Sequence, residues 1–196
     1  MRRIFLLLAA MAVALVVASG VALAVNKVGT DGPNTLRGTN GNDNLVGRGG
    51  NDWLLSLAGE DNLLGGEGKD VVTAETLRGR SYGGEKNMDG GRGNDFVFGG
   101  KSSDNVVGGG GNDYLIDGYE VNPRKDVVSA GDGNDGLWVW NRPAGKDVVT
   151  CGGGFDRVFA DRDDMLAPDC ERVFIGRGSV NAFFDSFPTS FWEGLP

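Results

Sequence analysis

The chain has 196 residues, of which 27 are acidic, 19 are basic and none is histidine, so its formal net charge is −8 at pH 7. This length suits a single domain, and the acidic balance argues against nucleic acid or an anionic membrane as a partner and favours cations. The lack of histidine excludes zinc proteases with an H-E-x-x-H motif, Ser-His-Asp triads and Cys-His dyads.

The N-terminal segment predicts a secretory signal peptide over residues 1–24. Two arginines precede an apolar run over residues 4–17, and an A-x-A pattern of small residues ends at Ala24. Cleavage after Ala24 would leave a secreted, extracellular chain with no membrane attachment. The alternative is an uncleaved anchor, because the apolar stretch reaches Val25 and is long enough to span a bilayer.

A period of nine residues organises the chain after this segment. From Gly38 the sequence reads GTNGNDNLV, GRGGNDWLL, SLAGEDNLL and GGEGKDVVT. Each unit has an aspartate, a glycine two residues before it and an aliphatic residue two residues after it. The aspartates are Asp43, Asp52, Asp61 and Asp70, and the aliphatic residues are Leu45, Leu54, Leu63 and Val72. Asn34 extends the series upstream, with asparagine in place of aspartate.

A nine-residue period fits a short turn followed by a short strand. Glycine supplies the turn, and the strand points its aliphatic residue inward and the neighbours outward. Two units then make one coil, which places Asp43 over Asp61 and Asp52 over Asp70. At a strand spacing of about 4.8 Å, two carboxylates repel by roughly 3 kcal/mol at an effective dielectric constant near 20. Such a stack forms readily only if a cation lies between the acids.

These units resemble the calcium-binding nonapeptide of RTX, or hemolysin-type, repeat proteins, G-G-x-G-x-D-x-U-x with U aliphatic. The closest matches are GGEGKDVVT from Gly65, GGRGNDFVF from Gly90 and GGGGNDYLI from Gly108. The resemblance implies an all-β fold, a parallel β-roll (a right-handed β-solenoid with two nonapeptides per coil). It also implies that backbone carbonyls and repeat aspartates hold Ca²⁺ ions in the turns.

Three insertions interrupt the series within a β-roll that we predict over residues 25–176. They lie near 74–89, 117–125 and 138–146, and the nine-residue pairing survives between them. A solenoid tolerates insertions at its turns.

The resemblance implies two sets of site residues. The expected calcium ligands are Asp43, Asp52, Asp61, Asp70, Asp95, Asp104, Asp113, Asp135 and Asp156, with Asn34, Asp126 and Asp147 as weaker candidates. The expected turn glycines are Gly41, Gly50, Gly59, Gly68, Gly93, Gly111, Gly133 and Gly154. Asp126 and Asp147 rank lower because they lack the glycine-rich lead-in, so an acid at a strand start explains them equally well.

Two features are expected to close the C-terminal end. Cys151 and Cys170 are the only cysteines, and in a secreted chain such a pair is most simply a disulfide, which would staple the last coil. Closing a loop of this length stabilises a fold by about 3 kcal/mol. The aromatic tail over residues 177–196 is expected to cover the open end of the roll or one sheet face, and a partner-docking element is the alternative.

Large apolar residues, three of them aromatic, also flank two of the aliphatic positions. Phe96 and Phe98 lie on either side of Val97, and Tyr114 and Ile116 hold the same positions 18 residues later. The four side chains are expected to stack on the outer face of one sheet. An apolar patch of this kind is typical of a contact surface, so we expect it to receive the tail or a partner.

The sequence therefore predicts a secreted, extracellular, non-enzymatic protein that folds around calcium. Its role would be structural, adhesive or partner-binding, with a cell-surface or matrix component as one partner beside calcium. The alternatives are a secreted enzyme with an unrecognised carboxylate site and a calcium buffer. The buffer is disfavoured because ligation is tied to folding.

Overall fold

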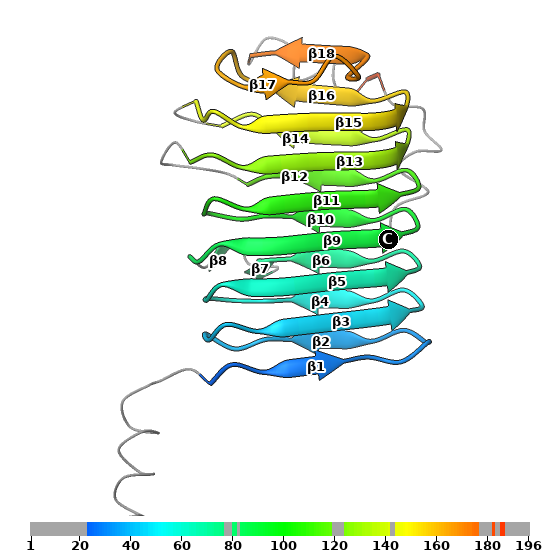
Figure 1. Ribbon diagram of the computed structural model, residues 1–196, viewed down its shortest axis with the longest axis vertical. Coiled ribbons are helices and arrows are strands. Elements are labelled where there is room, and N and C mark those ends of the chain that lie inside the picture. Colours follow the sequence, from blue (N-terminus) through cyan, green and yellow to red (C-terminus); the bar gives the residue numbers. More distant parts are fainter. Residues whose placement is uncertain are drawn as a thin grey trace, which may run out of the picture.

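The computed structural model describes residues 23–76, 80–81, 83–118, 124–141, 144–176, 182 and 185–186. The chain forms a parallel β-roll of about eight turns, which confirms the predicted fold class (Figure 1). The signal segment lies outside the described residues except for its last two, and so does most of the tail. Within the described part, no helix is long and apolar enough to cross a membrane.

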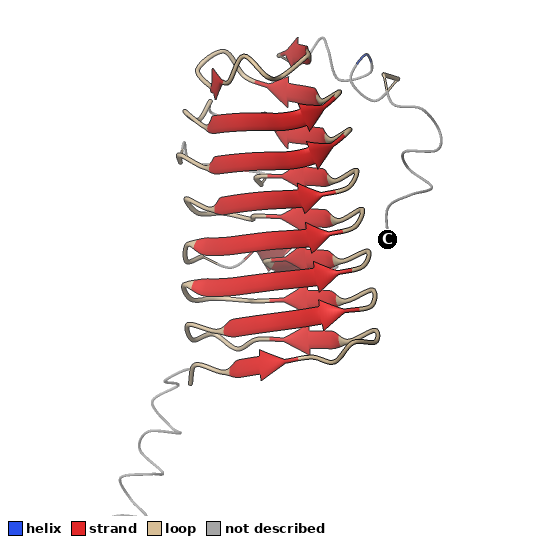
Figure 2. Ribbon diagram, turned by 45° about the vertical axis from the view of Figure 1, so that its right-hand side comes forward, coloured by secondary structure: helices blue, strands red, loops and turns tan. Residues whose placement is uncertain are grey.

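Two parallel sheets make up the roll, and strands alternate between them along the chain. The long-strand sheet contains β1 (Asn26–Val28), β3 (Asn44–Gly49), β5 (Asp61–Glu67), β9 (Lys86–Arg92), β11 (Asn105–Gly110), β13 (Val127–Gly133), β15 (Val148–Gly154) and β17 (Met165–Leu166). The short-strand sheet contains β2 (Thr35–Arg37), β4 (Trp53–Leu55), β6 (Val71–Thr73), β10 (Phe96–Phe98), β12 (Tyr114–Ile116), β14 (Gly136–Val139), β16 (Arg157–Ala160) and β18 (Arg172–Ile175). Figure 2 shows the two stacks of strands joined by turns at both edges.

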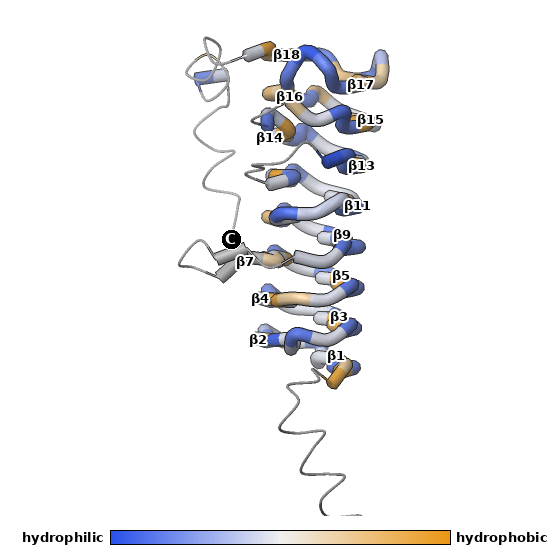
Figure 3. The backbone as a smooth tube through the Cα atoms, turned by 90° about the vertical axis from the view of Figure 1, so that its left-hand side faces the viewer, coloured by the Kyte–Doolittle hydropathy of each residue, from blue (hydrophilic) through white to orange (hydrophobic). Residues whose placement is uncertain are grey.

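Equivalent positions of successive coils pair in register. In uninterrupted coils the partners are 18 residues apart, as for Leu45 and Leu63. Across the first insertion they are 25 apart, as for Leu63 and Met88, because the extra residues leave the roll. These residues form a separate antiparallel hairpin, β7 (Glu75–Thr76) with β8 (Arg80–Ser81), which projects on the side of the short-strand sheet (Figure 3). Since β9 is back in register at its first residue, the extruded part is shorter than the 74–89 segment expected from the sequence.

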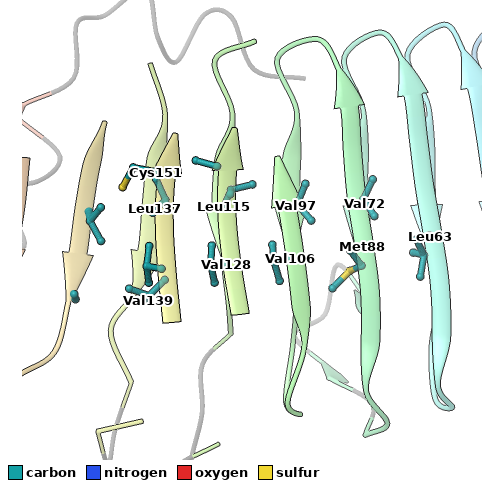
Figure 4. Close-up of a cluster of buried hydrophobic side chains, with 14 of the residues drawn as sticks. Leu63, Val72, Met88, Val97, Val106, Leu115, Val128, Leu137, Val139 and Cys151 are labelled. Carbon is teal, nitrogen blue, oxygen red and sulfur yellow. The ribbon is translucent and has the colours of Figure 1, made fainter. Parts of the chain in front are cut away.

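A single column of aliphatic side chains fills the space between the sheets (Figure 4). Each strand from β3 to β6 and from β9 to β16 contributes a fully buried residue at the centre of its pairing register, as Val97 and Leu115 do in neighbouring strands. The column includes Leu45, Leu54, Leu63, Val72, Met88, Val97, Val106, Leu115, Val128, Leu137, Val149 and Val158. Burying one such side chain contributes about 1.5–3 kcal/mol to the stability of the fold. Because the core is narrow, this apolar burial offsets little of the cost of burying charged groups at the turns.

The outer face of the long-strand sheet carries a ladder of amides. Each asparagine side chain donates its Nδ2 to the Oδ1 of the asparagine one coil earlier, at 2.7–3.1 Å. The ladder consists of Asn26, Asn44, Asn62, Asn87 and Asn105. These bonds tie adjacent coils together on the solvent side.

A second apolar cluster lies apart from the aliphatic column, on the short-strand sheet. Phe98, Tyr114 and Ile116 are buried there with Phe159 and Phe174. The cluster also includes the partly buried Phe96, Trp138 and Trp140. The four apolar residues predicted to flank the aliphatic positions therefore gather outside the core, and three of them, Phe98, Tyr114 and Ile116, are at most 7% exposed.

The C-terminal end of the roll is stapled as predicted. Cys151, in β15, and Cys170, which follows β17, form a disulfide. The predicted covering by the tail lies largely outside the described residues. Where the tail is described, the carbonyl of Ser186 accepts a 2.9 Å hydrogen bond from Nε of Arg157 in β16.

Candidate metal centre

The repeat acids form two columns, one along each edge of the roll. The long-strand column lies at the start of the long strands and contains Asp43, Asp61, Lys86, Asp104, Asp126, Asp147 and Asp164. The short-strand column precedes the short strands and contains Asn34, Asp52, Asp70, Asp95, Asp113, Asp135, Asp156 and Glu171.

One hydrogen bond recurs through both columns and fixes the carboxylates. The Oδ1 of each aspartate accepts the backbone N–H of the column member one coil earlier. Asp70 accepts from Asp52 at 2.7 Å, and Asp113 accepts from Asp95 at 2.8 Å. The predicted stacking of Asp43 with Asp61 follows the same rule, at 2.9 Å. Because one oxygen is committed to the backbone, the other is held at a fixed place inside the turn.

In the short-strand column this second oxygen is buried and has no hydrogen-bond partner. The orphaned atoms are the Oδ2 oxygens of Asp52, Asp70, Asp95, Asp113, Asp135 and Asp156. Leaving a buried charged acceptor unsatisfied costs more than the 1–3 kcal/mol of a neutral group, and native folds rarely tolerate it once. Six in one column indicate that a cation belongs beside them.

The backbone supplies further oxygens at the same places. A Cβ atom added at Gly90 would lie 2.7 Å from Asp95 Oδ2 and 2.7 Å from the carbonyl oxygen of Gly108 in the next coil. Within the short-strand column, the same pair of oxygens, from the turn's own aspartate and the next coil's carbonyl, also converges beside Gly47, Gly65 and Gly108. Carboxylate and carbonyl oxygens are the ligands that Ca²⁺ prefers. We call these four oxygen-lined places in the turns cradles. Their donor set fits calcium.

The turn glycines have the backbone geometry that the cradles need. Of the eight glycines predicted from the sequence, seven have positive φ angles; the exception is Gly41, in the first turn. A second set of positive-φ glycines two residues earlier, such as Gly66 and Gly91, was not part of the prediction. The glycine requirement is strongest at Gly93, where φ is +143° and an added Cβ would overlap the carbonyl oxygen of Gly68.

The electrostatics of the metal-free columns are unfavourable at neutral pH. Burial, together with the neighbouring carboxylates of Asp135 and Asp95, raises the pKa of Asp113 to about 8. Burial likewise raises the pKa of Asp95 and Asp135 to about 7, and that of Asp70 to about 6. Without a cation, these groups would hold protons in the folded state that they lose in the unfolded state.

This difference predicts how the stability of the metal-free chain depends on pH. Between pH 4 and pH 8 the folded state binds more protons than the unfolded state, so the free energy of unfolding falls as pH rises through this window. We expect more β-structure by circular dichroism at pH 5 than at pH 8 in metal-free chain. Added calcium should reverse the order, because it must displace those protons. Stability that rises with pH in the metal-free chain would contradict the burial of these carboxyls.

The two weaker aspartate candidates occupy regular column positions. The N–H groups of Asp104 and Asp126 donate to Oδ1 of Asp126 and Asp147, and both acids are fully buried. Asn34, the third of the weaker candidates, instead uses its Oδ1 to accept the N–H of Thr30 at 2.6 Å.

One group of buried acids joins two column members to a residue outside the columns. Asp117, Asp126 and Asp147 each offer a carboxylate oxygen within 4.8 Å of the others, and all three are buried. Nδ2 of Asn141 bridges Asp117 and Asp147 at 3.1 and 2.8 Å. Burial and the two neighbouring carboxylates raise the pKa of Asp117 well above its ordinary value. Asp117 stands where the repeat has its first glycine, which is why the sequence pattern did not mark it.

Three other column members were also missed. Asp164 and Glu171 end the two columns at spacings of 17 and 15 residues, outside the 18-residue rule, and accept the N–H groups of Asp147 and Asp156. Lys86 has the right spacing, 18 residues before Asp104, but is not an acid.

Comparison with known proteins agrees with this geometry. The family model for the RTX calcium-binding nonapeptide repeat (4 copies) matches residues 28–63, 49–76 and 82–115. No curated protein and no solved structure matches the chain. The matched segments contain the orphaned carboxylates from Asp52 to Asp113 and all four cradle glycines. The chain therefore carries RTX calcium-binding nonapeptide repeats.

Proposed function

We propose that this is a secreted protein whose β-roll folds around Ca²⁺ ions held in its turns, and that it acts through the rigid surface this creates. The observation that carries the proposal is the row of buried, unpartnered carboxylate oxygens from Asp52 to Asp156, each in the same place within its turn. A fold that buries so much uncompensated charge needs a counter-ion to be stable.

The ligand roles follow from the cradles. The aspartates of the short-strand column, with the carbonyls of the next coil, would hold the ions, and Asp43, Asp104, Asp126 and Asp147 would serve the other edge. Extracellular calcium sites often have dissociation constants near 10⁻⁴ M, so millimolar calcium contributes roughly 1.4 kcal/mol per site. Several such sites together decide whether the roll forms.

Isothermal titration calorimetry tests this proposal. We expect at least four Ca²⁺ ions per chain, one for each cradle beside Gly47, Gly65, Gly90 and Gly108. Mg²⁺ should bind more weakly, because it requires a smaller octahedral shell and gives up water reluctantly. Absence of calcium binding at millimolar concentration, or a single site, would rule the proposal out.

Secretion and a binding role are further parts of the proposal. The Cys151–Cys170 disulfide supports an oxidising compartment, as does the N-terminal sequence. The amide ladder and the aromatic cluster offer regular outer surfaces for a structural or adhesive contact. Pull-down with cell-wall or polysaccharide preparations, with calcium and with chelator, would test adhesion; equal retention in both would argue against a calcium-dependent surface.

A further inference from the structure

Lys86 occupies an aspartate position of the long-strand column. Its Cα pairs with that of Asp61 in the coil before, and its N–H donates to Asp104 Oδ1 at 2.7 Å in the coil after. These are the backbone relations that the repeat aspartates have with one another. The two residues that follow, Asn87 and Met88, continue the amide ladder and the aliphatic column.

The lysine side chain turns inward and brings its positive charge next to a repeat carboxylate. Its Nζ lies 3.2 Å from Asp61 Oδ2, and both side chains are fully buried. The same Nζ donates to the carbonyl oxygens of Gly59 and Gly84, the latter at 2.8 Å. An ammonium group surrounded by one carboxylate and two turn carbonyls has oxygen partners of the kind that the cradles offer to calcium.

We infer that Lys86 is a tethered cation that stands in for one calcium ion, so that this turn stays closed without metal. The inference rests on the proposed calcium-binding function of the other turns. Lys86 would then separate Asp43 and Asp61, on its N-terminal side in the long-strand column, from the acids that begin at Asp104. Its ion pair with Asp61 would hold these two parts together even when calcium is removed.

A lack of access for ions from the solvent does not explain why this turn has a lysine in place of an aspartate. A groove of about 560 Å³ lies over it, lined among others by Asp61, Lys86 and Asp104. Its other acidic residues, Asp43, Glu60 and Glu85, outnumber its one other base, Lys125, and would favour the approach of a divalent cation. The difference from the other turns is therefore the positive charge of Lys86.

Lys86→Asp tests the inference, because it restores the repeat acid. Calorimetry on the full chain should show at least one more Ca²⁺ ion per chain than in the wild type. Lys101→Asp is the matched control, since it makes the same charge change at an exposed position, and its stoichiometry should equal that of the wild type. If Lys86→Asp binds the same number of ions as the wild type, or does not fold in millimolar calcium, the inference is overturned.

Lys86→Met provides a second readout, because it keeps most of the side-chain bulk and removes the charge. We expect it to need a higher calcium concentration for half-maximal folding than either the wild type or Lys101→Met. An unchanged midpoint would overturn the inference. A wild-type chain that binds no calcium would overturn the proposed function and this inference with it, whereas unaltered stoichiometry in Lys86→Asp beside a calcium-binding wild type would overturn this inference alone.

Discussion

Gly93→Ala is expected to prevent the roll from closing at its centre, lowering the free energy of unfolding by about 4 kcal/mol or more. The added Cβ would overlap the carbonyl oxygen of Gly68 in the coil before, and the backbone φ of +143° disfavours any side chain. Relief would require the coils to move apart. That movement would break the bonds from Gly68 N–H to the carbonyl of Arg92 and from Gly93 N–H to that of Gly110, both 2.7 Å long.

Urea unfolding in millimolar calcium measures this effect. Gly110→Ala is the matched control, because an added Cβ there meets no atom within 4 Å and the backbone is not in the left-handed region. Its stability should stay within about 0.5 kcal/mol of the wild type. Similar behaviour of the two variants would show that the coils are not packed as closely as the structure requires.

Asp113→Asn is expected to change stability in opposite directions with and without calcium. The amide can still accept the N–H of Asp95 through Oδ1, but it loses the negative charge that a cation needs. With millimolar calcium, the variant should lose at least one ion and about 1.4 kcal/mol of stability. Without calcium it should be more stable than the wild type, because a buried carboxylate between Asp95 and Asp135 has been removed.

Asp163→Asn is the control for this prediction, since Asp163 is an exposed acid that belongs to neither column. It should change the midpoint of calcium-induced folding very little. Calcium titrations monitored by circular dichroism measure the change in stability with calcium. Urea unfolding in chelator measures the change without it. A loss of stability of Asp113→Asn under both conditions would indicate a purely structural role for the carboxylate.

The nine-residue period was sufficient to predict the architecture because it sets turn, strand and inward residue together. Leu45, Leu63 and Leu115 are fully buried where the period places them. The stacking of Asp95 with Asp113 likewise follows from their 18-residue separation. Within uninterrupted coils, residues 18 apart in the sequence always lie next to each other in adjacent coils, so the local pattern alone determines the contacts.

Insertions break this relation, and two of the unpredicted site residues, Lys86 and Asp117, lie beside them. Lys86 pairs with Asp61 across 25 residues, and a search for aspartates passes over it. The signal that could have identified it was the Asn87-Met88 pair that follows, which repeats the Asn62-Leu63 pattern. Position within the repeat was therefore a better guide than residue type.

Contacts that depend on loop length could not be read from the pattern. Asn141 reaches Asp117 across 24 residues because two insertions end at the same edge of the roll. Trp138 packs against Phe159 with ring centroids 4.6 Å apart, a contact set by register between coils of unequal length. Such contacts depend on where each insertion leaves and re-enters the sheet.

The most direct test of the central claim is far-UV circular dichroism of the chain during removal and return of calcium. In excess EGTA at pH 8 we expect the β-spectrum to be largely lost, with residual structure near the disulfide, because the buried carboxylates then repel one another and the glycine-rich turns lose entropy on ordering. Calcium added back to millimolar free concentration should restore the spectrum, and the same amount of Mg²⁺ should not. A β-spectrum that is unchanged in EGTA would contradict the account, because the columns would then be stable without the ions they are built to hold.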